Sequence, residues 1–197
     1  MTSALRPQLI VLAGPNGAGK STAAPELLRG ELGVSEFVNA DTIAQGLSAF
    51  APERVAQLAG RVMLTRLKKL AAERSNFAFE TTLASRSFAP WIAALRDRGY
   101  MCHLLFLWLP SVEQAVARVQ DRVRMGGHDV PEETIRRRYK AGVRNFFDLY
   151  RPIADTWRVY DNVGQSLPRL IASGCGRIAE VVADAASWRN FQAAGVR

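Results

Sequence analysis

A glycine-rich stretch near the N-terminus has the spacing of a phosphate-binding loop. The residues GPNGAGKS, from Gly14 to Ser21, fit the pattern G-x-x-x-x-G-K-[ST]. Glycines let backbone N–H groups approach phosphate oxygens, the lysine reaches the β and γ phosphates, and the serine hydroxyl suits Mg²⁺. The pattern therefore predicts binding of ATP or GTP with Mg²⁺, and Ser21 is the expected metal ligand. The expected nucleotide contacts are Gly14, Pro15, Asn16, Gly17, Ala18, Gly19, Lys20, Ser21 and Thr22.

Two acidic residues follow predicted strands and could complete such a site. Asp41 comes directly after the segment 36–40, and Glu80 follows the apolar run 77–79. In a doubly wound sheet the carboxyl ends of the strands face the ligand crevice. An aspartate there can accept the proton of a hydroxyl that attacks the γ phosphate, although capping of the next helix is an alternative role for Asp41. Glu80 could support Mg²⁺, hold substrate hydroxyls or lie on the surface, and the sequence leaves these roles open.

A basic stretch with two adjacent glycines lies between residues 118 and 151. It contains nine basic and five acidic residues, within a chain of net charge +8. This excess indicates an anionic ligand, which nucleotide phosphates or a nucleic acid could supply. The sequence RMGGH has the composition of a mobile flap, and we expect a flexible lid over about residues 118–138.

The framework that positions these residues shows alternating strand and helix patterns. Helical spacing of apolar residues predicts a helix over 52–74, and capping signals at Ser111 and Asp129 predict two more helices. Such alternation is typical of an α/β fold with a mainly parallel sheet. We expect a three-layer P-loop NTPase fold, closed by a C-terminal helix over about residues 174–194. The predicted strands are 9–12, 36–40, 77–79, 103–109 and 157–160.

Length and composition set further limits. A chain of 197 residues with 48% hydrophobic content can bury one substantial core, which predicts a single domain over residues 1–197. No segment approaches the roughly 20 apolar residues of a membrane-spanning helix, so we expect a cytoplasmic protein that does not bind membranes. Cys102 and Cys175 lack a C-x-x-C spacing, which argues against a disulfide framework or a zinc site.

Motifs that are missing favour a kinase over other nucleotide-binding proteins. The chain contains neither N-K-x-D, which reads guanine in switch GTPases, nor the L-S-G-G-Q signature of transport ATPases. Two alternatives remain. A polynucleotide-end kinase would use the basic stretch, but no aromatic stacking strip accompanies it, so nucleic acid is not the expected partner. A nucleotide-binding regulatory module would act through a protein partner, and Asp41 and Glu80 would then need no acceptor pocket.

Five motifs, in order, resemble the zeta-toxin family of P-loop kinases, in particular its short single-domain bacterial members. They are AGPNGAGKST, NADT, FAFETTL, RVRMGGHDVPEETIRRRYKAG and YDN, within residues 8–162. The resemblance implies an NTP-dependent kinase of a small molecule. The best-known members of that family phosphorylate the 3′-hydroxyl of UDP-N-acetylglucosamine and are held in check by an antitoxin. A nucleotide-like acceptor and an antitoxin partner are therefore expected.

The resemblance also implies roles for individual residues at the centre of the site. Lys20 and Ser21 take the places of the phosphate and Mg²⁺ contacts. Asp41 takes the place of the general base. Glu80 and Thr82 match the pair that contacts the substrate.

The lid is where this chain departs from the family pattern. Arg118 and Arg122 are candidates for the first lid arginine, and Arg122 is preferred because it lies closer to the glycines. Alignment on Pro131 puts His128 where the family has a second arginine. Either His128 contacts the substrate, or an arginine from the next helix reaches in, and Arg137 is assigned to the catalytic set. The arginines of that helix are Arg136, Arg137 and Arg138.

Overall fold

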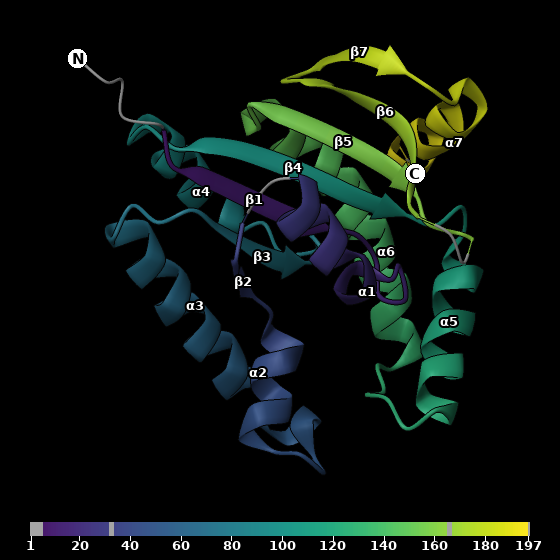
Figure 1. Cartoon of the computed structure of the whole chain (residues 1–197). Helices are drawn as coiled ribbons and strands as arrows, with labels where there is room; N and C mark the ends of the chain where they lie inside the picture. Colours follow the sequence, from purple (N-terminus) through teal and green to yellow (C-terminus); the bar gives the residue numbers. More distant parts are fainter. Residues whose placement is uncertain (1–5, 32–33, 165–166, 197) are drawn as a thin grey trace.

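A single seven-stranded sheet forms the centre of the computed structural model, which describes residues 6–31, 34–164 and 167–196 (Figure 1). The strand order is β2-β3-β1-β4-β5-β6-β7; the first five of these are mutually parallel, and β6 and β7 are antiparallel to their neighbours. All five predicted strands are confirmed. The strands are β1 (Gln8–Ala13), β2 (Glu36–Val38), β3 (Phe77–Thr81), β4 (Met101–Trp108), β5 (Thr156–Asp161), β6 (Arg169–Cys175) and β7 (Ile178–Val182).

Helices cover both faces of the sheet, with α1 in front of it and α4 and α6 behind it in Figure 1. The fold is therefore the expected α/β arrangement with a mostly parallel central sheet. The helices are α1 (Lys20–Ala24), α2 (Ala40–Leu47), α3 (Ala56–Ala72), α4 (Phe88–Asp97), α5 (Val112–Arg124), α6 (Glu132–Asn145) and α7 (Ala185–Val196). Short 3₁₀ turns lie at Pro52–Val55 and Arg151–Ile153, and π-helical turns at Pro25–Glu31 and Phe146–Tyr150. Among the helices of the described residues, none has both the length and the apolar content that a membrane span requires.

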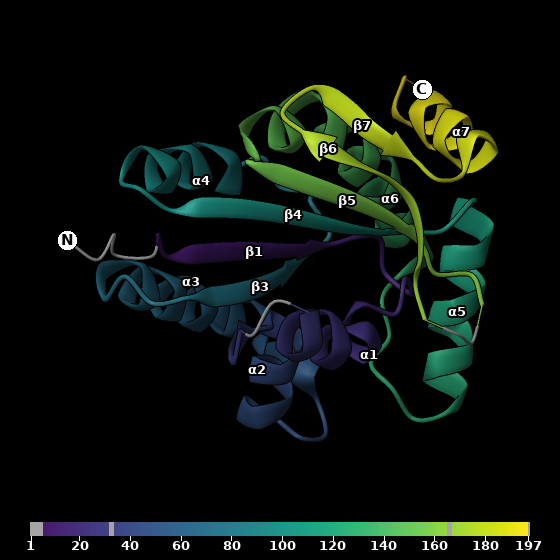
Figure 2. The same ribbon diagram turned by 45° about the horizontal axis from the view of Figure 1, so that its top comes forward.

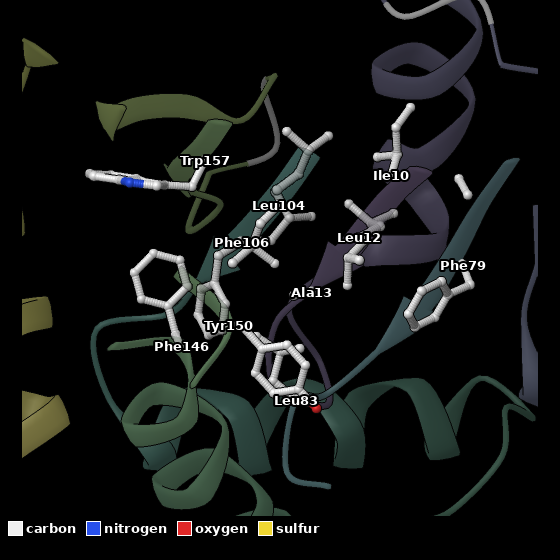
Figure 3. Close-up of a cluster of buried hydrophobic side chains, with 14 of the residues drawn as sticks. Ile10, Leu12, Ala13, Phe79, Leu83, Leu104, Phe106, Phe146, Tyr150 and Trp157 are labelled. Carbon is white, nitrogen blue, oxygen red and sulfur yellow. The ribbon is translucent and has the colours of Figure 1, made fainter. Parts of the chain in front are cut away.

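The hydrophobic core joins the ends of the central strands to the helices behind them (Figure 3). Phe79 of β3 and Phe106 of β4 are fully buried, and Phe106 packs edge-on against Phe146 at a centroid distance of 5.3 Å. Burial of large aromatic rings is among the strongest local contributions to stability. The carboxyl ends of β1, β3 and β4 are thereby held in fixed positions from which the site loops begin.

The predicted closing helix over about 174–194 is wrong in its first part. Strands β6 and β7 form an antiparallel pair there, and the helix begins only at Ala185. Gly176, with a φ of 48°, lies in the turn between them. Gly174 lies within β6 next to a bulge, where a Cβ would lie 2.0 Å from the carbonyl oxygen of Ile178 on the neighbouring strand. Trp188 and Phe191 of α7 are buried packing residues.

The helix predicted over 52–74 exists with two differences. Its first residues form a 3₁₀ turn, and α3 proper begins at Ala56. Leu58 and Val62, two of the apolar residues whose spacing predicts this helix, are 43% and 40% exposed. The buried face is made by Ala59, Met63, Leu67, Leu70 and Ala71.

The two predicted helix starts around the lid have different outcomes. Ser111 caps α5 as expected, because its hydroxyl accepts a hydrogen bond from the backbone N–H of Gln114 at 3.2 Å. Asp129 does not cap α6, which begins at Glu132 after Pro131 and has no side-chain cap. The proline supplies the start instead, since its fixed φ suits the entrance to a helix.

Candidate active site

The phosphate loop is built around glycines that nothing larger can replace. Gly14, Gly17 and Gly19 have φ values of 144°, 77° and 76°, which side chains rarely adopt. A Cβ at Gly14 would lie 2.3 Å from the carbonyl oxygen of Leu107, and one at Gly19 would lie 2.6 Å from Nδ2 of Asn162. The loop is therefore seated directly against the ends of β4 and β5, with its backbone free to surround phosphate oxygens.

Lys20 lies at the start of α1 and is only 6% exposed. Its Nζ donates a hydrogen bond to the carbonyl oxygen of Pro15 at 2.9 Å and lies 3.5 Å from Oε1 of Glu80. Burial lowers the pKa of Lys20, and the negative charges of Glu80 and Asp41 oppose that shift. The lysine predicted to contact phosphate is thus held beside the loop by a carboxylate from β3.

Glu80, Ser21 and Asn39 form one hydrogen-bonded group. The Ser21 hydroxyl donates to Oε2 of Glu80 at 2.8 Å, and Nδ2 of Asn39 donates to the same oxygen at 2.7 Å and to the Ser21 hydroxyl at 3.2 Å. Asn39 is only 6% exposed and was not predicted as a site residue. Its position before a helix is a capping signal, but nothing in the sequence around it points to Glu80.

These residues suit a magnesium ion bound together with a nucleotide. Mg²⁺ prefers oxygen ligands and commonly takes one or two from the protein, leaving the rest to phosphates and water. The Ser21 hydroxyl and the Glu80 carboxylate supply such oxygens directly beside the phosphate loop. Within residues 6–31, 34–164 and 167–196, no group of three or more His, Cys, Asp or Glu side chains could hold a metal alone.

Asp41 is the second residue of α2 and is exposed. The helix cap is Asn39, whose Oδ1 accepts hydrogen bonds from the backbone N–H groups of Asp41 at 2.7 Å and Thr42 at 3.4 Å. The alternative role of Asp41 as the cap is therefore excluded. In the described part of the chain its carboxylate has no hydrogen bond, and it lines a cavity of about 40 Å³ together with Gln45 and His128.

The lid faces this cavity from the other side of the site. Both views show α2 and α5 projecting from the same side of the sheet (Figure 2). His128 also lines a larger cavity of about 360 Å³, which it shares with Phe50 and Gly126. The structure thus brings His128 and Asp41 together, although they lie far apart in the sequence.

Arg118 and Arg122 have different surroundings. The Arg118 guanidinium donates hydrogen bonds to the carbonyl oxygens of Asn162 at 2.7 Å and Val163 at 2.6 Å, beside the phosphate loop. Arg122 donates to the carbonyl oxygen of His128 at 2.6 Å, and its positive charge contributes to the lowered pKa of Lys20. Its buried Nε has no hydrogen-bond partner among the described residues.

The three arginines of α6 also differ. Arg136 forms an ion pair with Glu113 at 3.0 Å, which joins α6 to α5, and another with Glu132 at 2.8 Å within α6. Arg137 is exposed, whereas Arg138 is half-buried. The guanidinium of Arg136 is therefore already paired with two carboxylates.

Thr82 lies in the loop after β3, under α6. A Cβ at Gly142 of α6 would lie 2.3 Å from the Thr82 carbonyl oxygen, so helix and loop are in close contact. The Thr82 hydroxyl accepts a hydrogen bond from the backbone N–H of Ala84 at 3.4 Å. Thr82 and Glu80 thus share one end of β3, and Thr22 lies exposed on α1.

Comparison with known proteins places the chain in a family. The model of the AAA domain family matches residues 9–146. An uncharacterised protein of Haemophilus influenzae is 29% identical over 132 residues, which cover 66% of this chain and 91% of that protein.

Solved structures share the fold at low sequence identity. A chain of the AvrRxo1-ORF1:-ORF2 complex superposes with a TM-score of 0.73 at 17% identity, covering 94% of this chain. This chain spans only 63% of the length of that one. A chain from the PezAT chromosomal toxin-antitoxin system of Streptococcus pneumoniae gives a TM-score of 0.65 at 16% identity, covering 98% of this chain and 86% of that one. The chain belongs to the AAA domain family and has the fold of a P-loop kinase-like, nucleotide-binding domain.

Proposed function

We propose that this protein is a kinase that transfers the γ phosphate of ATP or GTP to a hydroxyl group of a small, nucleotide-like acceptor. The observation that carries the proposal is the position of Asp41. Its carboxylate is close enough to Lys20 to affect the pKa of the lysine, yet it has no hydrogen bond within the described ranges and lines a cavity. A carboxylate in that position suits a general base beside bound phosphates.

The proposed reaction is an in-line transfer. The acceptor oxygen attacks the γ phosphorus, its proton passes to Asp41, and the bond between the γ phosphorus and the bridging oxygen breaks to release the nucleoside diphosphate. Lys20 neutralises charge on the phosphates. Ser21 and Glu80 would hold Mg²⁺, which supplies further neutralisation of the phosphate oxygens when bound.

Two lid arginines are proposed to contact the transferring phosphoryl group. Arg122 is the first, because its charge acts on Lys20 whereas Arg118 is engaged by backbone carbonyls at the end of β5. For the second, Arg138 is favoured over Arg137. It lies one helical turn before Gly142 and so on the face of α6 that packs over Thr82.

The acceptor and the partner are proposed from similarity. UDP-N-acetylglucosamine is the first acceptor to test, because the motif order resembles the zeta-toxin family. The fold similarity to a chain of the PezAT toxin-antitoxin system makes an antitoxin the first protein partner to seek.

The rival function, a polynucleotide-end kinase, would need a free cationic surface along the basic stretch. Several of its arginines already have partners within the protein. Arg118 donates to carbonyl oxygens, Arg124 pairs with Asp121 at 3.0 Å, and Arg136 pairs with two glutamates. These contacts support a small-molecule acceptor.

The test is to incubate the protein with Mg²⁺, ATP or GTP labelled at the γ phosphate, and a metabolite extract, and to identify labelled products by mass spectrometry. UDP-N-acetylglucosamine is tested separately as a pure compound. We expect a labelled phosphomonoester that the Lys20→Met protein does not form. Nucleotide binding without a product from any metabolite pool would instead support the regulatory module.

A further inference from the structure

We infer that Asn39 is a positioning residue that organises the metal side of the site and fixes the start of the helix that carries Asp41. The inference rests on the proposed function, because it assigns Asn39 a role toward the Mg²⁺ bound with the nucleotide. The starting observation is that the buried side-chain amide of Asn39 makes hydrogen bonds through both its nitrogen and its oxygen.

The donor end of the amide acts on the two proposed metal ligands. Nδ2 of Asn39 lies 2.7 Å from Oε2 of Glu80 and 3.2 Å from Oγ of Ser21, which are themselves 2.8 Å apart. A hydrogen bond from an amide to a carboxylate fixes the orientation of the carboxylate. Groups that orient metal ligands in this way commonly change metal affinity 10-fold to 100-fold when they are removed.

The acceptor end of the same amide acts on α2. Oδ1 of Asn39 accepts hydrogen bonds from the backbone N–H groups of Asp41 and Thr42, which caps the helix. Asp41 is therefore attached through Asn39 to the residues around the metal position. A hydroxyl donates and accepts through a single atom, whereas the amide of Asn39 carries its donor and its acceptor on separate atoms, so that one reaches Glu80 while the other reaches the start of α2.

The two roles can be separated by substitution. Serine caps helices about as well as asparagine, but it is shorter and has no amide donor. Asn39→Ser should therefore keep the cap of α2 and lose the contacts to Glu80 and Ser21. Ser111→Ala is the matched control, because it removes the cap of α5 and leaves Asn39 intact.

The experiment measures the affinity of each protein for adenylyl imidodiphosphate, an unhydrolysable ATP analogue, with MgCl₂ and with EDTA. We expect Asn39→Ser to bind the analogue within about 2-fold of the parent in EDTA, and to lose about 10-fold or more of the tightening caused by Mg²⁺. Ser111→Ala should melt at a lower temperature with an unchanged magnesium effect. Asn39→Thr, which also caps, repeats the test if Asn39→Ser is poorly folded.

A second comparison asks whether Asn39 acts through Glu80. If it does, adding Asn39→Ser to a Glu80→Gln protein should change the magnesium effect by less than about 2-fold, because the shared contact is already lost. A normal magnesium effect in folded Asn39→Ser would overturn the inference alone. No magnesium effect in the parent would overturn the metal role in the proposed function, and the inference with it.

Discussion

Lys20 and Glu80 form an ion pair beside the phosphate loop, with 3.5 Å between Nζ and Oε1 and side-chain exposures of 6% and 12%. The pair joins the first residue of α1 to the end of β3. Since Glu80 also accepts hydrogen bonds from Ser21 and Asn39, its charge is compensated from three sides. The phosphates of a bound nucleotide would offer Lys20 a second set of negative charges at the same place.

Replacement of Lys20 by methionine should nearly abolish transfer. Methionine keeps much of the buried volume but removes the positive charge, and loss of one such electrostatic contact costs on the order of 10² to 10³ in rate. The measurement is phosphotransfer to the identified acceptor, with nucleotide affinity and a thermal melt. Lys68→Met, at an exposed position of α3, is the control. Near-normal turnover by a folded Lys20→Met protein would show that the phosphate-loop interpretation is wrong.

Asp41→Asn tests the general base. Asparagine keeps the size of the side chain and loses the carboxylate, so transfer should fall by about 10² to 10⁴-fold while nucleotide affinity changes little. Because Asn39 caps α2, the substitution should leave the melting temperature close to that of the parent. Transfer within a few-fold of the parent would remove Asp41 from the mechanism.

The arginines of α6 can be ranked by single substitutions to alanine. Arg138→Ala should lower kcat by about 10² to 10³-fold if Arg138 stabilises the transferring group. Arg137→Ala should stay within a few-fold of the parent because Arg137 is exposed, and Arg136→Ala should mainly reduce stability through the loss of its ion pairs. Steady-state transfer and thermal melts distinguish these effects. A larger loss in Arg137→Ala than in Arg138→Ala would reverse the assignment.

Nucleotide should order the lid. Hydrogen exchange over about residues 118–138 is expected to slow when adenylyl imidodiphosphate and Mg²⁺ are added. The largest change should fall in residues 125–131, since the segments on either side already form α5 and α6. Peptides from α7 serve as the internal control. Equal exchange across the lid with and without nucleotide would contradict this prediction.

The stability of the protein should fall at alkaline pH partly because of Cys102. Burial, reinforced by the negative charge of Asp155, raises the pKa of its thiol to about 12, from an ordinary value of 9.0. Between these values the unfolded thiol loses its proton and the folded thiol keeps it, so rising pH favours unfolding. Replacing Cys102 by alanine should reduce the loss of unfolding free energy by up to about 1.4 kcal/mol per pH unit in this range. Urea unfolding at several pH values measures how the unfolding free energy of the parent and of Cys102→Ala changes with pH. Equal changes in the two proteins would contradict the assignment.

The strands could be predicted well from the sequence because buried strands appear in it as continuous apolar runs. The segment 103–109, for example, is almost wholly apolar, and β4 is buried along most of its length. Strand β7 was missed for the opposite reason. Val181 and Val182 are 49% and 44% exposed, so their spacing does not report a buried face.

The site residues were predictable where a local motif defines them and not where distant contacts do. Lys20 and Ser21 follow from the loop pattern alone. Asn39 acquires its second role only because β2 and β3 pair, which brings a residue 41 positions away within 2.7 Å. Arg118 and Arg122 lie one turn apart on one helix, so the sequence does not distinguish their roles. The contact between Arg118 and the carbonyl oxygen of Asn162, which only the structure shows, distinguishes them.

The close contact between Gly142 and Thr82 lies in the part of α6 that is held against the rest of the fold. Around this contact the helix is fixed, because Tyr139 donates to the carbonyl oxygen of Leu109 and Asn145 to that of Leu83. Arg138 lies next to the anchored Tyr139 and only about 6 Å along the helix axis from Gly142, whereas the start of the helix lies about 15 Å away. A movement of the lid glycines and of the start of α6 would therefore displace Arg138 much less than those residues, so the lid can open while this arginine stays close to its position.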